Sequence, residues 1–147
     1  MIWKPNTTVA AVIEQDGKFL LVEEETADGI RLNQPAGHLE DGETLLDAVA
    51  RETFEETAYR FEPQHLLGIY HWRRPDKEVT YLRFAFTGDA MGPEPGVALD
   101  EGIIRAVWMS PDEIRNCQAM HRSPQVLLCI EHYLAGQRFS LSAITHL

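Results

Sequence analysis

The chain has 147 residues, a length that suits one compact domain and is short for two, so we expect a single domain over residues 1–147. Its formal net charge of −10 argues against a protein that holds nucleic acid polymers on a basic face, because that mode of binding neutralises phosphates with lysine and arginine. If the ligand is an anion, something must carry positive charge to it, and a bound divalent cation would do so.

The cysteines and the apolar segments restrict the cellular setting. Cys117 and Cys129 lie without CxxC spacing or a histidine cluster, so we interpret both as reduced core thiols. No apolar stretch approaches membrane-spanning length, and charged Glu14 follows the first short apolar run too soon for a signal peptide. The sequence therefore predicts a cytoplasmic protein with no membrane partner; its oligomeric state stays open.

The first elements are predicted to be strands. Residues 7–25 read as two β runs around a turn at Gln15-Asp16-Gly17, which predicts a hairpin. The apolar segment at residues 30–32 is followed by proline and glycine, which predicts a brief strand entering a long loop.

A helix is expected next, with Thr44 as its N-cap and an end near Thr57, because apolar residues recur there at helical spacing. Residues 65–74 and 78–90 are predicted as two strands joined across Pro75 and Asp76, and residues 91–102 as a loop. A last strand is expected at residues 103–109, a short helix with proline at its first position at residues 110–116, and a helix closing on Gly136 at residues 123–136. This order of elements indicates an α+β or mixed α/β fold.

Three glutamates gather at the end of the predicted central helix: Glu52, Glu55 and Glu56. At 3.6 residues per turn they fill one arc of about 100° beside the core-facing stripe, and Arg51 falls on the far side. Like charges one turn apart oppose helix formation by roughly 0.2–0.5 kcal/mol. Such a cluster is ordinarily a solvated acidic face, and its functional interpretation is a site for a hard cation, Mg²⁺ first and Mn²⁺ second.

The residues around these glutamates favour the metal site over the solvated acidic face. Their order and spacing resemble the Nudix box, which calls for seven fixed residues, of which six are present: Gly37, Glu43, Arg51, Glu52, Glu55 and Glu56. The departure is Ala58, which stands where the family has glycine. Outside the box, segments such as "NQPAGHLE" and "RRPDKEVTYLRF" resemble the NudJ-type phosphatase branch of this family.

The resemblance implies an α/β/α sandwich around a mixed β-sheet. It also implies hydrolysis of phosphoanhydride bonds in nucleoside tri- and diphosphates and related small diphosphates by attack of water at phosphorus. Hydroxymethylpyrimidine diphosphate and thiamine diphosphate join these substrates if the likeness to the NudJ-type branch holds. Alternatives are an ADP-ribose or other nucleotide-sugar pyrophosphatase, a non-catalytic nucleotide sensor on the same fold, and a structural domain whose acidic helix binds cations only for stability.

The resemblance also assigns roles. Glu52, Glu55 and Glu56 become metal-binding and water-activating acids, and the carbonyl of Ala36 a further ligand of Mg²⁺ or Mn²⁺. Arg51 and Glu43 become an ion pair that orients the acids, for which a plain surface salt bridge is the alternative.

The general base stays open, with four candidates: Glu52, Glu55, Asp100 and Glu101. Trp72 lies at a strand end, where its ring either stacks on a substrate base or belongs to the core. Arg83 alternates with apolar neighbours, so it faces away from them and meets either a phosphate or solvent.

Overall fold

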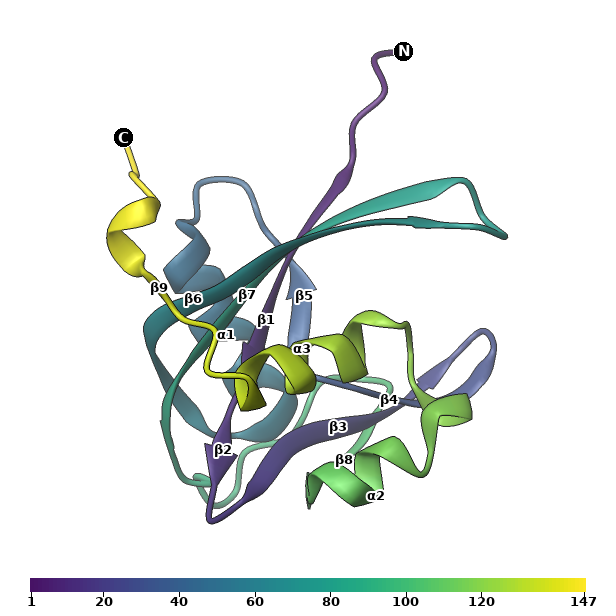
Figure 1. Ribbon diagram of the computed structural model, residues 1–147, viewed down its shortest axis with the longest axis vertical. Helices are drawn as coiled ribbons and strands as arrows, with labels where there is room; N and C mark the ends of the chain where they lie inside the picture. Colours follow the sequence, from purple (N-terminus) through teal and green to yellow (C-terminus); the bar gives the residue numbers. More distant parts are fainter.

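The computed structural model describes all residues, 1–147, and its strands form two sheets (Figure 1). The first sheet has the order β5-β1-β7-β6-β9, with bounds Ala36–His38, Asn6–Val12, Val79–Met91, Arg60–Arg74 and Phe139–Ser140. The second sheet contains β2, β3, β4 and β8, with bounds Glu14–Gln15, Lys18–Thr26, Gly29–Asn33 and Ile103–Met109. Strands β1 and β7 are parallel and all other pairs are antiparallel, so the first sheet is mixed.

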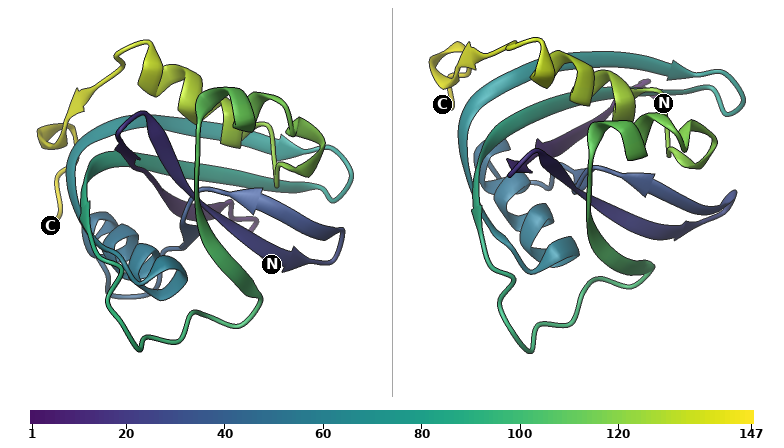
Figure 2. Two further views of the ribbon diagram at one scale, coloured as in Figure 1. Left: turned by 90° about the horizontal axis from the view of Figure 1, so that it is seen from below. Right: turned by 60° about the horizontal axis from the view of Figure 1, so that its bottom comes forward.

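The helices lie on both sides of the first sheet. Helix α1 covers one face and helix α3 the other, as two views show (Figure 2). The helical segments are α1 (Leu45–Thr57), α2 (Pro111–Arg115) and α3 (Gln125–Leu134), with short 3-10 turns at Gln118–Met120 and Leu141–Ala143. The fold is α+β, as predicted, with α1, the mixed sheet and α3 as successive layers.

Strand β1 shows why both faces of the first sheet are covered. Its residues are apolar in succession: Val9 and Ala11 pack in the core on the α1 side, whereas Ala10 and Val12 pack in the core on the α3 side. A strand that is apolar on both faces is typical of a sheet between two helical layers. The central strand therefore anchors both halves of the core.

Helix α1 begins and ends close to the predicted residues. The side chain of Thr44 accepts a hydrogen bond from the backbone N–H of Asp47 at 3.1 Å, which caps the helix. Thr53 and Thr57 are buried, and each hydroxyl donates to a backbone carbonyl one turn earlier, so neither leaves an unpaired polar group in the core. The helix ends at Ala58 with φ of 63°, the left-handed conformation that a glycine usually supplies.

The predicted hairpin is only partly correct. The turn is present, with positive φ at both Asp16 and Gly17, but only Glu14 and Gln15 pair with β3. Strand β1 belongs to the first sheet, where it pairs with β5 and β7. The local pattern identified both strands without revealing that they separate into different sheets.

Four other expectations need correction. Strand β5 lies within the predicted loop, and β6 begins at Arg60 instead of residue 65, because a register shift accommodates Pro63. The predicted last strand, β8, is followed by the two-residue β9. Cys129 is a buried thiol as expected, but Cys117 is only half-buried; both are free.

No helix has the length and apolarity needed to cross a membrane.

Candidate active site

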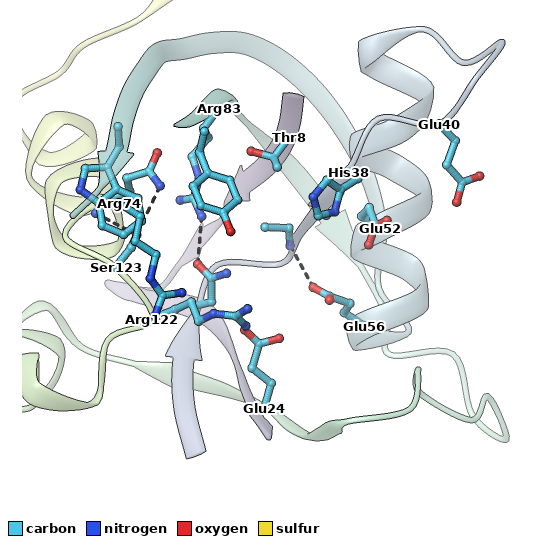
Figure 3. Close-up of a pocket in the computed structure, with 16 residues that line it drawn as sticks. Thr8, Glu24, His38, Glu40, Glu52, Glu56, Arg74, Arg83, Arg122 and Ser123 are labelled. Atoms are coloured by element: carbon cyan, nitrogen blue, oxygen red, sulfur yellow. Dashed lines mark hydrogen bonds and ion pairs between the residues drawn. The ribbon is translucent and has the colours of Figure 1, made fainter. Parts of the chain in front are cut away.

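A cavity of about 420 Å³ lies where the edge strand β5 meets the end of α1 (Figure 3). Part of its wall is a row across the first sheet, in which His38 of β5 lies opposite Thr8 of β1, and Thr8 opposite Arg83 of β7. Its lining combines glutamates and arginines with few apolar groups: Thr8, Glu24, Asn33, Ala36, Gly37, His38, Glu40, Glu52, Glu56, Trp72, Arg74, Tyr81, Arg83, Arg122, Ser123 and Gln125. In Figure 3 the glutamates of α1 lie on one side of the cavity, and Arg74 and Arg122 on the other.

Three acids converge at the end of α1. One carboxylate oxygen from each of Glu52, Glu55 and Asp100 lies within 4.8 Å of the other two. Asp100 belongs to the loop of residues 92–102, whose backbone is attached to the end of the helix. The N–H of Asp100 donates to the carbonyl of Glu55, and the N–H of Glu94 to that of Ala58, both at 2.9 Å. These bonds satisfy helix carbonyls that lack intrahelical partners and hold Asp100 beside the glutamates.

Glu101, the other acid considered in this loop, is exposed and is not part of the converging group. The structure thus brings together three of the four candidate bases, Glu52, Glu55 and Asp100. The sequence could suggest the loop acids only by resemblance, because nothing in the local pattern shows that residues 94 and 100 bond to the helix end.

Glu56 differs from its neighbours because it is buried, with 8% of its surface exposed. Its Oε1 accepts a hydrogen bond from the backbone N–H of Ala36 at 2.9 Å. Burial raises the pKa of this carboxyl to about 8, although the bond from Ala36 opposes the rise. The interpretation of the three glutamates as a solvated acidic face therefore does not hold for Glu56, because β5 covers it.

Arg51 joins the acids instead of facing away from them. Its Nε and Nη2 donate to the two carboxylate oxygens of Glu43 at 2.6 and 2.9 Å, and its Nη1 donates to Glu52 at 2.7 Å and Glu55 at 3.3 Å. The bond to Glu43 is the main reason that the pKa of Arg51 is raised, and Arg51 in turn lowers the pKa of Glu43. A long side chain on the flank of the helix reaches back to these carboxylates, which the helical angle alone does not reveal.

Gly37 allows the loop backbone to lie against Glu52. A Cβ atom at position 37 would overlap the carboxyl group of Glu52. The nearby backbone buries Glu52, and this burial raises the pKa of its carboxyl, opposed by the bond from Arg51. The glycine is therefore needed for space rather than for a positive φ.

These acids suit a hard divalent cation. Glu52, Glu55 and Asp100 supply oxygen ligands in a region where Arg51 is the only cation paired with them. No sulfur or imidazole is part of the group, which favours Mg²⁺ or Mn²⁺ over zinc. Carboxylates this close together repel one another, and a bound cation relieves that repulsion.

The opposite side of the cavity contains aromatic rings and paired arginines. Trp72 of β6 is half-buried and stacks on Tyr81 of β7, with ring centroids 5.9 Å apart and an angle of 18° between planes. Arg74 bonds to Asp28 and Asp76, each at 2.8 Å. Trp72 therefore lines the cavity, and is not a core residue.

Arg83 is buried in the wall of the cavity, with 4% of its surface exposed. Its Nη1 donates to Oε1 of Gln34 at 2.9 Å, and its Nη2 to Oδ1 of Asn33 at 3.0 Å. The alternative that Arg83 faces solvent is wrong. Strand alternation gives the face on which a side chain lies, but not which face another layer covers.

Comparison with known proteins defines the class to which this fold and site belong. The NUDIX domain model matches residues 3–128, and the chain belongs to the Nudix family and is a Nudix hydrolase. The curated relative Phosphatase NudJ of Escherichia coli K12 is 44% identical over 144 residues, which cover 97% of this chain and 92% of that protein.

Solved structures agree. A NUDIX hydrolase from Nitrosomonas europaea has a TM-score of 0.95 and 54% identity, covering 98% of both chains. A MutT NUDIX hydrolase from Burkholderia pseudomallei has a TM-score of 0.75 at 20% identity, covering 88% of this chain and 98% of that one, and this likeness concerns the fold alone.

Proposed function

We propose that this Nudix hydrolase cleaves phosphoanhydride bonds in nucleoside tri- and diphosphates and in related small diphosphates, with hydroxymethylpyrimidine diphosphate and thiamine diphosphate among them. The observation that carries the proposal is the convergence of Glu52, Glu55 and Asp100 beside a cavity of about 420 Å³. The 44% identity to a protein named as a phosphatase supports the same class of reaction.

The proposed metal ligands are Glu52, Glu55 and Asp100, whose carboxylates converge, with Glu56 and the carbonyl of Ala36 as further candidates. A divalent cation bound there supplies positive charge for the phosphate oxygens and lowers the pKa of water. Arg51 and Glu43 are positioning residues, because their paired hydrogen bonds fix the side chain that contacts Glu52 and Glu55.

The protein's own part in the reaction is to hold the substrate and accept a proton. Water attacks phosphorus, the P–O bond of the anhydride breaks, and the leaving phosphate departs with the bridging oxygen. The proton of the attacking water passes to one of the converging carboxylates. Glu52, Glu55 and Asp100 are the candidate acceptors, because their carboxylate oxygens converge at this point.

Hydrolysis of a panel of substrates, with the products separated and quantified by ion-exchange chromatography, tests the proposal. The panel contains nucleoside tri- and diphosphates, thiamine diphosphate, hydroxymethylpyrimidine diphosphate and ADP-ribose, each with Mg²⁺ and with excess EDTA. We expect turnover of the first four with Mg²⁺ and none with EDTA. Undiminished turnover in EDTA would contradict the metal site, and a preference for ADP-ribose by kcat/KM would favour the nucleotide-sugar pyrophosphatase alternative.

A further inference from the structure

One carboxyl and one guanidinium group are buried in this molecule, those of Glu56 and Arg83, and both line the same cavity. Burial of a charge is strongly unfavourable unless an opposite charge compensates it. Glu56 belongs to the proposed metal site, where a cation would compensate it. Arg83 is not explained by that site.

Arg83 has no carboxylate partner. It is absent from every ion pair of the molecule, whereas the other two arginines of the cavity, Arg74 and Arg122, each bond to acids. The guanidinium of Arg83 bonds to the neutral amide oxygens of Gln34 and Asn33, and its Nε has no hydrogen-bond partner at all. The side chain is thus held in place while its positive charge is not neutralised.

The other groups around Arg83 are also neutral. The Sγ atom of Cys129 lies 3.9 Å from Nη1, and Tyr70, opposite Arg83 on β6, bonds through its hydroxyl to a ring nitrogen of His132. The amide of Gln34 is fixed because its nitrogen donates to a backbone carbonyl of α3 at 2.8 Å, which turns its oxygen toward the guanidinium. No carboxylate of the protein forms an ion pair with Arg83, so its charge has no direct counter-charge.

The position of Arg83 points to a ligand as the source of that charge. Arg83 lies opposite Thr8, and Thr8 opposite His38, so two strand spacings, or about 10 Å, separate Arg83 from β5. Figure 3 shows Arg83 and Thr8 between the glutamates of α1 and the two paired arginines. A substrate held at the acids of α1 therefore extends toward Arg83.

We propose that Arg83 binds a phosphate group of the substrate and thereby selects molecules with two or more linked phosphates over monophosphate esters. This inference rests on the proposed hydrolysis at the acids of α1. One phosphate lies at the metal site, and a neighbouring phosphate accepts hydrogen bonds from Arg83, whose planar guanidinium suits phosphate oxygens. A monophosphate ester can make only one of these two contacts. A neutral carbonyl of a substrate ring would also accept a hydrogen bond, but it would leave the buried charge without a counter-charge.

Thermal unfolding of the metal-free protein tests the anion site without any turnover. The melting temperature is measured in EDTA with inorganic phosphate or with chloride at equal ionic strength. We expect phosphate to stabilise the wild type and Arg105→Gln, an exposed-arginine control outside the cavity, but not Arg83→Gln. No stabilisation of the wild type, or equal stabilisation of Arg83→Gln, would overturn the proposal.

A second measurement follows the folded wild-type protein, in case Arg83→Gln does not fold, and needs only the conservative variant Arg83→Lys for assignment. Arginine Nε–H groups are labelled with ¹⁵N, and Arg83→Lys identifies the Arg83 resonance by its loss. Because this N–H is buried without a partner, we expect its resonance to shift when phosphate is added in EDTA. An unchanged Arg83 resonance at saturating phosphate would refute binding at this residue.

Steady-state kinetics with Mg²⁺ then test selectivity. For a nucleoside diphosphate, Arg83→Gln is expected to raise KM and lower kcat/KM by roughly 10- to 100-fold, the range for the loss of a charge-assisted hydrogen bond. The kcat/KM for the monophosphate is expected to fall by a smaller factor, so the ratio of the two kcat/KM values narrows. An equal loss for both substrates would refute selection by Arg83. If phosphate binds at Arg83 in EDTA but no substrate is hydrolysed, the proposed function fails and the anion site stands.

Discussion

Ala58 ends α1 with φ of 63°, a conformation in which an alanine is strained and a glycine is not. We therefore expect Ala58→Gly to raise the free energy of unfolding by up to about 1 kcal/mol. Urea denaturation of the two proteins measures the difference, and an unchanged m-value shows that only stability has changed. A lower midpoint for Ala58→Gly would mean that the buried methyl group matters more than the backbone strain.

Gly37 provides a second test at a single residue, this time of activity. A methyl group at this position would overlap the carboxyl group of Glu52, which must then move away from Glu55 and Asp100. Displacement of a catalytic group by about 1 Å costs on the order of 100-fold in rate, so we expect a loss of at least this size in kcat for Gly37→Ala. Full activity in this variant would show that the position of Glu52 is not critical.

Glu56 makes the stability of the metal-free protein depend on pH. Its carboxyl has an ordinary pKa of 4.5, and burial in the folded protein raises the pKa to about 8. Between these values the folded state keeps a proton that the unfolded state releases, so the free energy of unfolding falls as pH rises. We expect a loss on the order of 2 kcal/mol from pH 5 to pH 8 in EDTA.

Glu56→Gln is the control for this pH dependence. Its amide oxygen can still accept the hydrogen bond from Ala36, but the side chain does not titrate, so this part of the slope should disappear. Urea denaturation at several pH values, with EDTA throughout, gives both slopes. The same slope in wild type and variant would assign the pH dependence to other groups.

At the scale of elements, the loop of residues 92–102 offers a matched pair of adjacent acids. Both side chains are exposed, but Asp100 joins the converging carboxylates and Glu101 does not. We expect Asp100→Asn to raise the Mg²⁺ concentration for half-maximal activity by at least about tenfold, because it removes a ligand charge. Glu101→Gln should change that concentration by less than about twofold, as for other exposed charges. Mg²⁺ titrations that give equal shifts for the two variants would remove Asp100 from the metal site.

Some of the helices and strands could be predicted from the sequence, and others could not. The span of α1 follows from local signals that survive folding, namely a capping threonine and apolar residues at helical spacing. The separation of β1 from β3 does not, because β1 pairs with β7, whose residues lie more than sixty positions away. The sequence does not predict strand β5, because its residues Ala36, Gly37 and His38 have little strand preference. The pairing with β1 holds them extended.

Some features of the candidate site could likewise be predicted from the sequence, and others could not. The clustering of Glu52, Glu55 and Glu56 could be predicted from their spacing, since a helix places them on one arc, and their roles were implied by the resemblance to the Nudix box. The burial of Glu56 and Arg83 could not, because it depends on β5 and α3, which cover these side chains from distant parts of the sequence. The roles of the site residues stay predictions until they are measured.

At the scale of the whole molecule, charge limits the size of the substrate. A net charge of −10 repels a polyanion, and the cavity has space for one small substrate. We expect kcat/KM for a capped RNA to be at least about tenfold below that for a nucleoside diphosphate at low salt, where repulsion is strongest. Parallel assays of phosphate release and cap cleavage test this. A preference for capped RNA would refute the argument from charge.

The single domain and the cytoplasmic location also belong to this scale, and both stay predictions. The match to the NUDIX domain over residues 3–128 covers most of the chain, and the first sheet runs through both halves of the core. Limited proteolysis would test the first prediction by showing whether a smaller folded unit survives.

The attachment of the loop of residues 92–102 has a consequence for directed evolution. Its two bonds to the end of α1 come from backbone N–H groups, so they do not depend on which side chains the loop carries. Pro95 and Ala98 are exposed between these two anchor points. A library randomised at these two positions can therefore vary the surface near the acids while Asp100 keeps its place. This protein should thus tolerate a search for new substrate preferences in this loop without first losing its chemistry.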